Sequence, residues 1–378
     1  AGFGNAVAQQ TALVQALRRG SPLTAQQRAL IAPERSDIIT VYRELQARRW
    51  HAEDMQPLFA KLGEEHSGKT LVALTALEQV GLIAAVERGV DLVPVVADST
   101  STAKIAPFIK QFPGRLVNVG IAEQSMVGTA AGLALGGKVA VTCNAAPFLI
   151  SRANEQIKVD VCYNNTNVKL FGLNAGASYG PLASTHHSID DLAVMRGFGN
   201  IQIFAPSTPR ECRQIIDYAL AYQGPVYIRL DGKALPELLD ESYRFVPGAV
   251  LTLREGEDVA LVATGSTVHE VVEAAQQLAD LGIQAKVVSV PSIRPCDTAA
   301  LLAALQPCGS VITVEEHNVN GGLGSLVAEV LAEAGVGIAL QRLGIPDGEY
   351  AAAADRGWMR QYHGFDAAAI VALVQKRD

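Results

Sequence analysis

Short runs of apolar residues alternate with helix-like segments from about Thr70 to the end of the chain, and this alternation constrains the fold most. The runs at 92–97, 168–173 and 258–263 are rich in apolar residues throughout, and not only at every second position. Such strands are buried on both faces, which is typical of a parallel sheet covered by helices. We therefore predict an α/β protein: two consecutive three-layer α/β domains with mainly parallel sheets, preceded by a short helical extension.

The domain boundaries are predicted from changes in this pattern. Residues 1–66 carry Gln, Arg, Glu and apolar residues at helical spacing, which predicts two or three amphipathic helices. They form either an extension or dimerisation arm, or a solvated helical lead-in. A segment with two prolines and several acids, 235–248, is the predicted linker. We expect one α/β domain at 67–240 and a second at 241–378.

Composition argues against several classes of function. Hydrophobic residues make up 49% of the 378 residues, enough for a large core, and the net charge is −7. Without a run of Lys and Arg, nucleic acid is not an expected partner. The apolar stretches are interrupted before the roughly 18–20 residues that a membrane helix needs, so no membrane is expected. Five cysteines without a C-x-x-C pair, and an amino end without a secretion signal, favour a reduced chain in the cytoplasm.

Three local patterns imitate known sites and are set aside. The segment 132–138 resembles a P-loop, but Val139 replaces the required Ser or Thr. The segment 321–324 has glycines like those of a dinucleotide-binding turn but lacks the last glycine of the G-x-G-x-x-G pattern. A tight strand–helix turn is therefore the better interpretation. Two histidines, a serine and an acid at 186–190 suggest a nucleophilic triad, but no Gly-x-Ser-x-Gly accompanies them. No metal-ligand spacing is found either, so we predict no metal site in this chain.

The segment 118–128, NVGIAEQSMVG, carries the most informative residue. We expect a strand to end at Val119, Gly120 to turn the chain, and Glu123 to lie in the first turn of an apolar helix. The helix dipole alone favours an acid there by about 0.3–1 kcal/mol. Because the surroundings are apolar and an unpaired buried carboxylate is costly, we expect Glu123 to have a buried partner or to share a proton.

A series of short motifs runs through both halves of the chain. They are NVGIAEQ (118–124), AAGLALGGKVA (130–140), SRANEQI (151–157), THHSIDDLAVMR (185–196), APSTPRE (205–211), GPVYIRL (224–230), VPSIRP (290–295), ITVEEHN (312–318) and GGLG (321–324). In kind and order these motifs resemble those of the transketolase family of thiamine-diphosphate enzymes. The segment 98–234 resembles the family's pyrimidine-binding domain, and 250–378 resembles its carboxy-terminal domain. The layout resembles the split form, in which this half is its own polypeptide.

The resemblance implies thiamine diphosphate as the cofactor. Glu123 would hydrogen-bond N1′ of the aminopyrimidine and favour the imino tautomer, whose 4′ nitrogen removes the thiazolium C2 proton. Such a relay is expected of a buried acid with a raised proton affinity. Phe148 would pack on the pyrimidine ring, although it is also a plausible core residue. Ile121, and Asp98 at a strand end, are the other cofactor-binding candidates.

The resemblance also implies a set of substrate residues. His186, in the family's Thr-His motif, would contact substrate oxygens and move protons, with His187 beside it. Arg229 is the next candidate, and the family has a phosphate-binding Arg shortly after this position. Lys233 either replaces that Arg or the contact is lost.

Three positions depart from the sugar-using pattern. The family's Gly-Glu-Asp-Gly-x-Thr-His is GPLASTH at 180–186, so Leu182 stands where an acid would bind a sugar hydroxyl. Asn174 replaces a second His, and Ala145 replaces an aromatic residue three positions before Phe148. The cofactor residues are kept while the polyol contacts are not. We therefore expect substrates other than the standard pentose phosphates.

The diphosphate-binding half of the family is missing. That half holds the diphosphate through a metal, using Gly-Asp-Gly followed by an Asn, and the similar triplet at 346–348 is not followed by that Asn. We expect Mg²⁺ (or Ca²⁺) to be held mainly by a partner, an amino-terminal diphosphate-binding transketolase-like subunit. A heterotetramer with two chains of each kind is the expected assembly.

The favoured function is the pyrimidine-binding subunit of a two-component transketolase-like enzyme, active only with its partner. It would transfer a two-carbon ketol or acyl unit from a ketose or 2-oxo donor to an acceptor. One alternative is the β subunit of a 2-oxo-acid dehydrogenase, which CO₂ release would identify, although THHSIDDLAVMR and ITVEEHN favour transketolase. The other is a non-catalytic partner subunit, against which the presence of Glu123 and His186 argues.

Overall fold

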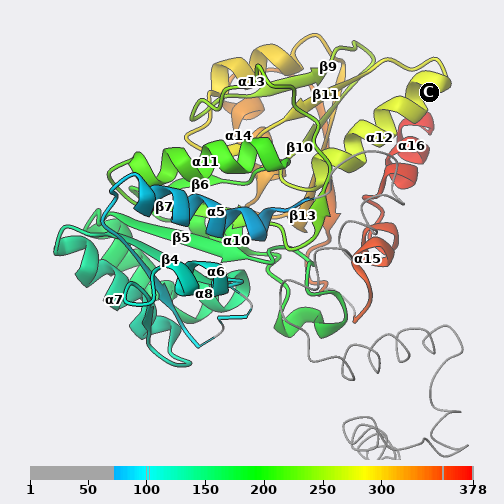
Figure 1. Cartoon of the computed structure of the whole chain (residues 1–378). Coiled ribbons are helices and arrows are strands. Elements are labelled where there is room, and N and C mark those ends of the chain that lie inside the picture. The colour runs from blue at the N-terminus through cyan, green and yellow to red at the C-terminus, as the bar shows by residue number, and fades with distance from the viewer. Residues whose placement is uncertain (1–71, 99, 102, 351–352, 377–378) are drawn as a thin grey trace, which may run out of the picture. The chain divides into compact units, whose positions relative to one another are not determined.

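A computed structural model describes residues 72–98, 100–101, 103–350 and 353–376, and a seven-stranded sheet forms its first half (Figure 1). The strand order is β12-β6-β7-β5-β4-β2-β3, parallel throughout except at β12, which pairs antiparallel with β6. The expected helices of 1–66 lie outside the described residues. The strands are β2 (Leu92–Val96), β3 (Val117–Asn118), β4 (Val139–Ala145), β5 (Val168–Leu173), β6 (Gln202–Phe204), β7 (Val226–Leu230) and β12 (Ser292–Arg294).

A five-stranded sheet forms the second half, in the order β14-β13-β10-β11-β9. Only β9 is antiparallel to its neighbour among these described strands. A short antiparallel pair, β1 (Val72–Ala73) with β8 (Ala234–Leu235), lies outside both sheets. The second sheet consists of β9 (Leu251–Arg254), β10 (Val259–Ala263), β11 (Ala285–Ser289), β13 (Ser310–Asn318) and β14 (Ala339–Ile345).

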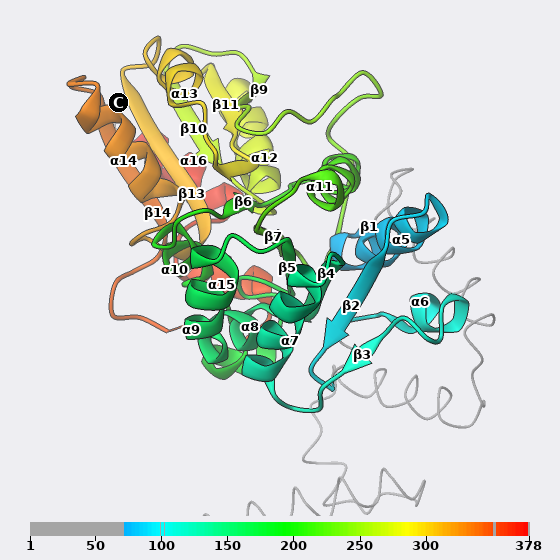
Figure 2. The same cartoon turned by 90° about the vertical axis from the view of Figure 1, so that its left-hand side faces the viewer.

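Helices cover both faces of each sheet (Figure 1 and Figure 2). Around the first sheet, α5, α6 and α11 share one apolar core, and α7, α8, α10 and the π-helix η3 pack on the other face. Around the second, α12 and α16 share a core that is separate from that of α13 and α14. The prediction of two three-layer α/β domains with mainly parallel sheets is confirmed. The helices are α5 (Leu74–Glu87), α6 (Ala106–Gln111), α7 (Glu123–Leu135), α8 (Ala146–Arg152), α9 (Asn154–Gln156), η3 (Ile157–Tyr163), α10 (Asp191–Arg196), α11 (Pro209–Ala221), α12 (Thr267–Asp280), α13 (Thr298–Leu305), α14 (Leu323–Glu333), α15 (Arg356–Tyr362) and α16 (Ala367–Gln375).

Local sequence explains where several elements lie. Every residue of β5, β7, β10 and β11 is buried, as expected for central parallel strands. Several of the helices start where a short polar side chain accepts a backbone N–H: Thr208 caps α11, Asp297 caps α13 and Asp366 caps α16. In the part of the chain that is described, none of the helices has the length and apolar character needed to cross a bilayer.

A buried ion network joins the two halves. Arg356, at the start of α15, donates from Nη1 to Asp231 Oδ1 (2.8 Å) and from Nε to Glu316 Oε2 (2.7 Å). Asp231 follows β7 of the first sheet, whereas Glu316 lies in β13 of the second. Arg360 also reaches Glu316. Burial acts to raise the pKa of Glu316, but the two guanidinium groups hold it well below its ordinary value.

One buried acid lies apart from this network. Glu78 of α5 is fully buried. Burial raises its pKa to about 8, and the Cys143 thiol and the Lys104 ammonium offset only part of that rise. The folded chain therefore holds a proton on Glu78 at neutral pH, whereas the unfolded chain releases it near the ordinary pKa of 4.5.

This difference makes stability depend on pH. The stabilisation from protonated Glu78 is fully present below the unfolded pKa and is lost as the pH rises through the folded pKa of about 8. Relative to the Glu78→Gln variant, the wild-type free energy of unfolding should fall by up to about 1.4 kcal/mol per pH unit across that window. Urea unfolding of both proteins measures it, with Glu87→Gln at the exposed end of α5 as the control. A difference that does not vary with pH would contradict the assignment.

Candidate active site

The turn between β3 and α7 is built by one asparagine side chain. Asn118 Oδ1 accepts hydrogen bonds from Asp98 N (3.1 Å) and from Gly120 N (3.0 Å). Gly120 has a φ of +76°, a conformation that glycine adopts without strain. The turn delivers Glu123 as the first residue of α7, as predicted. Ile121 lies in the same turn with 78% of its surface exposed.

The carboxylate of Glu123 is buried and has a cationic partner. Arg152, the last residue of α8, donates from Nη1 to Glu123 Oε1 at 2.8 Å, and Asn144 Nδ2 lies 3.5 Å from the same oxygen. The exposed fraction is 7% for the Glu123 side chain and 49% for that of Arg152. The sequence predicts a buried partner or a shared proton; Asn144 is buried, but the charged partner, Arg152, is half exposed. Sequence reasoning missed its identity, although Arg152 lies within the SRANEQI motif.

Aromatic contacts connect this acid to the Thr-His motif. The Phe148 ring lies 5.1 Å from the His186 ring, edge to face, and the Arg152 guanidinium carbon lies 4.1 Å from the Phe148 ring centroid. The Tyr179 ring also contacts the His186 ring edge to face, with ring centroids 5.6 Å apart. The structure thus brings together, through Arg152, three residues predicted from separate segments of the sequence: Glu123, Phe148 and His186.

The segment 180–185, which precedes His186, forms a short 3₁₀ turn. Leu182 lies in it and is 51% exposed. Thr185 Oγ1 lies 2.9 Å from His186 Nδ1, so the hydroxyl engages that ring nitrogen. His187 is buried beneath the turn, where its Nε2–H donates to Gly180 O at 2.9 Å. Burial lowers the pKa of His187, so its ring supports the backbone as a neutral group.

The remaining predicted substrate residues have different surroundings. Arg229 is buried, and its guanidinium donates to Asp191 and to the carbonyls of Ser188 and Glu316. This arrangement favours a structural role and counts against the predicted substrate contact of Arg229. Lys233 is exposed, two residues after Asp231. Burial of the Lys104 ammonium lowers its pKa, the Glu78 carboxylate acts to raise it, and the charge of Lys233 lowers it further.

Two more candidates occupy strained backbone positions. Asn174, after β5, has a φ of +54°, and its amide oxygen would lie 1.9 Å from a side chain added at Gly232. The glycine is therefore required for Asn174 to occupy this place. Asp98, at the end of β2, is exposed with a φ of +62°. Both residues follow carboxyl ends of parallel strands, the edge where ligands bind in α/β sheets.

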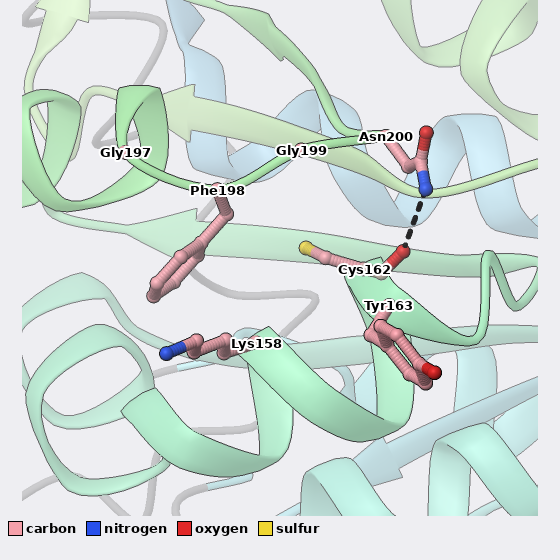
Figure 3. A pocket seen from close by; sticks show the side chains of 7 residues that line it. All are labelled: Lys158, Cys162, Tyr163, Gly197, Phe198, Gly199 and Asn200. Carbon is pink, nitrogen blue, oxygen red and sulfur yellow. Dashed lines mark hydrogen bonds between the residues drawn. The ribbon is translucent and has the colours of Figure 1, made fainter.

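A surface pocket of about 230 Å³ lies between η3 and the turn after α10 (Figure 3). Lys158, Cys162 and Tyr163 line it from the π-helix, opposite Phe198. Asn200 Nδ2 closes one side by donating to Cys162 O at 3.2 Å. None of the residues predicted for cofactor or substrate lines this pocket.

The residues at this site fit one part of thiamine diphosphate. A buried carboxylate beside a half-buried aromatic ring suits a planar, nitrogen-rich pyrimidine. A magnesium diphosphate group is not matched in the same way. Within the described ranges, no three His, Cys, Asp or Glu side chains are grouped so that they could hold a metal ion.

Comparison with known protein families assigns both halves. Residues 71–237 match the transketolase pyrimidine-binding domain, and residues 248–370 match the transketolase carboxy-terminal domain. Thiamine-diphosphate dependence is a property of this family.

Individual relatives agree with this assignment. One of the subunits of the apulose-4-phosphate transketolase of Actinobacillus succinogenes is 75% identical over 77% of this chain and 94% of its own length. The SqwH subunit of a 6-deoxy-6-sulfo-D-fructose transketolase, from a Clostridium species, is 35% identical over 77% of this chain and 88% of its own. A third relative, 1-deoxy-D-xylulose-5-phosphate synthase 1 of Geobacter sulfurreducens, is 37% identical over 75% of this chain. The match covers only 45% of the synthase.

A solved structure is similar over most of the chain. It is a split-gene transketolase in the form of an inactive β4 tetramer, and it covers 81% of this chain and 97% of its own, with 37% identity and a TM-score of 0.72. The chain therefore belongs to the transketolase family, as the enzyme subunit that carries the pyrimidine-binding and carboxy-terminal domains of a split enzyme.

Proposed function

We propose that this chain is the pyrimidine-binding subunit of a two-component ketol transferase that acts on apulose 4-phosphate. The observation that carries the proposal is 75% identity to a subunit of an apulose-4-phosphate transketolase, across 94% of that relative. The corresponding subunit of the apulose-4-phosphate transketolase of Phocaeicola vulgatus is 40% identical over 68% of this chain. The departures at Leu182, Asn174 and Ala145 support a substrate other than the standard pentose phosphates.

The clustered side chains divide the work at the site. Glu123 binds the pyrimidine N1′ and Phe148 packs on the pyrimidine ring. When bound, thiamine diphosphate supplies the nucleophilic carbon and the electron sink for breaking a carbon–carbon bond beside a carbonyl. His186 moves a proton to or from a substrate oxygen at Nε2, because Thr185 engages its Nδ1. Lys233, with Lys104 nearby, attracts the substrate phosphate.

A partner subunit completes the site. The diphosphate and its Mg²⁺ or Ca²⁺ are held mainly by an amino-terminal transketolase-like subunit, in a heterotetramer with two chains of each kind. The similar split-gene transketolase is an inactive tetramer of β chains, which supports a need for a second type of chain. We infer a complex that works in the cytoplasm, and the five free cysteine thiols support this inference.

The need for a partner is tested on cofactor binding. Isothermal titration calorimetry of the isolated chain with thiamine diphosphate and Mg²⁺ should show no binding at concentrations that saturate the two-subunit complex. The physical reason is that the diphosphate carries most of the cofactor's charge, and the described residues include no group of three His, Cys, Asp or Glu side chains that could hold its Mg²⁺. Tight, magnesium-dependent binding by the isolated chain would refute the division of the site.

The role of Glu123 is tested by Glu123→Gln in the two-subunit complex. The amide keeps the shape of the side chain but cannot exchange a proton with N1′, so the rate of C2–H exchange should fall by about 10²–10⁴-fold. Deuterium exchange followed by NMR measures it. Glu155→Gln changes an exposed acid on the adjacent α9 and should leave the rate unchanged. If the Glu123→Gln complex exchanged C2–H at the wild-type rate, Glu123 would have no role in the proton relay and would only stabilise the start of α7.

The substrate is tested with a panel of donors and acceptors. The wild-type complex should turn over apulose 4-phosphate, and xylulose 5-phosphate should be a poor donor, because Leu182 cannot accept a hydrogen bond from the sugar hydroxyl. Leu182→Asp should shift the kcat/KM ratio toward xylulose 5-phosphate by about tenfold or more. Leu182→Ala, which removes bulk without adding an acceptor, is the matched control. Efficient wild-type use of xylulose 5-phosphate, unchanged by Leu182→Asp, would show that this position does not select the substrate.

A further inference from the structure

Arg152 contacts both residues that we assign to the pyrimidine. Its Nη1 lies 2.8 Å from Glu123 Oε1, and its guanidinium carbon lies 4.1 Å from the centroid of the Phe148 ring. Phe148 and Arg152 are four residues apart in α8, so both side chains lie on one face of that helix. The two contacts of Arg152 therefore meet at a single place, the edge of the pyrimidine site.

The geometry differs from that of an ordinary surface ion pair. An exposed pair such as Arg88 with Asp217, 55% exposed on each side, contributes little. In the Arg152 pair the acid is 7% exposed and only the cation reaches solvent. A planar guanidinium can stack on an aromatic ring and donate in its own plane at the same time, which the point charge of a lysine cannot do.

The hydrogen bonds to Glu123 are also one-sided. Arg152 and Asn144 both reach Oε1, and no hydrogen bond from any described residue reaches Oε2. A carboxylate whose one oxygen is held by an arginine has a defined rotamer, and its second oxygen is left to accept from a ligand.

We propose that Arg152 is a positioning residue for the cofactor. By holding Oε1 and packing on one face of Phe148, it presents Oε2 to the pyrimidine N1′ and leaves the other ring face for the pyrimidine. The inference rests on the proposed function, because it needs Glu123 and Phe148 to bind that ring. An opposite arrangement has the guanidinium in the place of the pyrimidine itself, where it would compete with the cofactor.

The sign of the change in cofactor affinity separates these arrangements. In the two-subunit complex with saturating Mg²⁺, Arg152→Gln should raise the Kd of thiamine diphosphate about tenfold, the loss of one charge-assisted hydrogen bond. Arg152→Lys, which keeps the charge but loses the planar fork, should recover part of this loss. Arg88→Gln is the matched control and should leave the Kd unchanged.

Calorimetry measures each Kd, and thermal unfolding verifies that the variants are folded. Tighter binding by Arg152→Gln would mean competition, and unchanged binding would mean a surface pair, so either result overturns the proposal.

A double-mutant cycle tests whether Arg152 acts through Glu123. If it does, introducing Arg152→Gln into the Glu123→Gln complex should raise the Kd clearly less than introducing it into the wild-type complex. Equal effects in the two backgrounds would overturn the proposal. The wild-type complex distinguishes the two levels of failure. If it does not bind thiamine diphosphate at all, the proposed function itself is wrong. If it binds and Arg152→Gln binds equally well, only the role of Arg152 is wrong.

Discussion

The Arg356 guanidinium, held between Asp231 and Glu316, is the interaction on which the position of the site depends. Its side chain is only 10% exposed, and the two acids are buried. Removing one partner of such a network leaves a buried charge uncompensated, which typically costs about 3–5 kcal/mol. Asp231 follows a strand of the first sheet and Glu316 lies in a strand of the second. The ion pairs of Arg356 therefore fix the position of the two sheets relative to each other.

The same network reaches the segment that carries His186. Glu316 Oε1 accepts the backbone N–H of Ala177 at 2.7 Å, just before the 3₁₀ turn. At the other end of the turn, His187 donates to Gly180 O. The Cα of Gly180 lies so close to Ala354 O that an added Cβ would stand 3.3 Å away. Buried contacts thus fix the ends of the turn, and His186 meets Phe148 as a consequence.

The sequence predicted the parts of this arrangement that have a local signal. Apolar runs located β5 and β10, and the Gly120 turn placed Glu123 at the start of α7. It could not predict contacts between distant residues. Arg152 and Glu123 are 29 positions apart, and Arg356 and Asp231 are 125 apart. The three residues of β12 show no period and join the first sheet from beyond the predicted linker. The motif alone assigns Arg229 to the substrate, but the structure pairs its buried guanidinium with the buried Asp191 carboxylate, a contact that the sequence does not reveal.

On the proposed function, the turn before His186, with ends held by buried contacts and an exposed middle, would let one fold bind different sugars. Leu182 lies in the middle of the turn and is half exposed, so its side chain contributes little to the core. If Leu182 faces the substrate as proposed, a change from acid to leucine there alters which sugar hydroxyl finds a hydrogen-bond partner without disturbing the contacts that hold the turn. Glu123 and Phe148 lie on other elements, α7 and α8, and do not depend on that choice. On the proposed function, the side chain that selects the substrate lies on a different element from those that bind the cofactor, as expected where function is set by side chains placed on a shared fold.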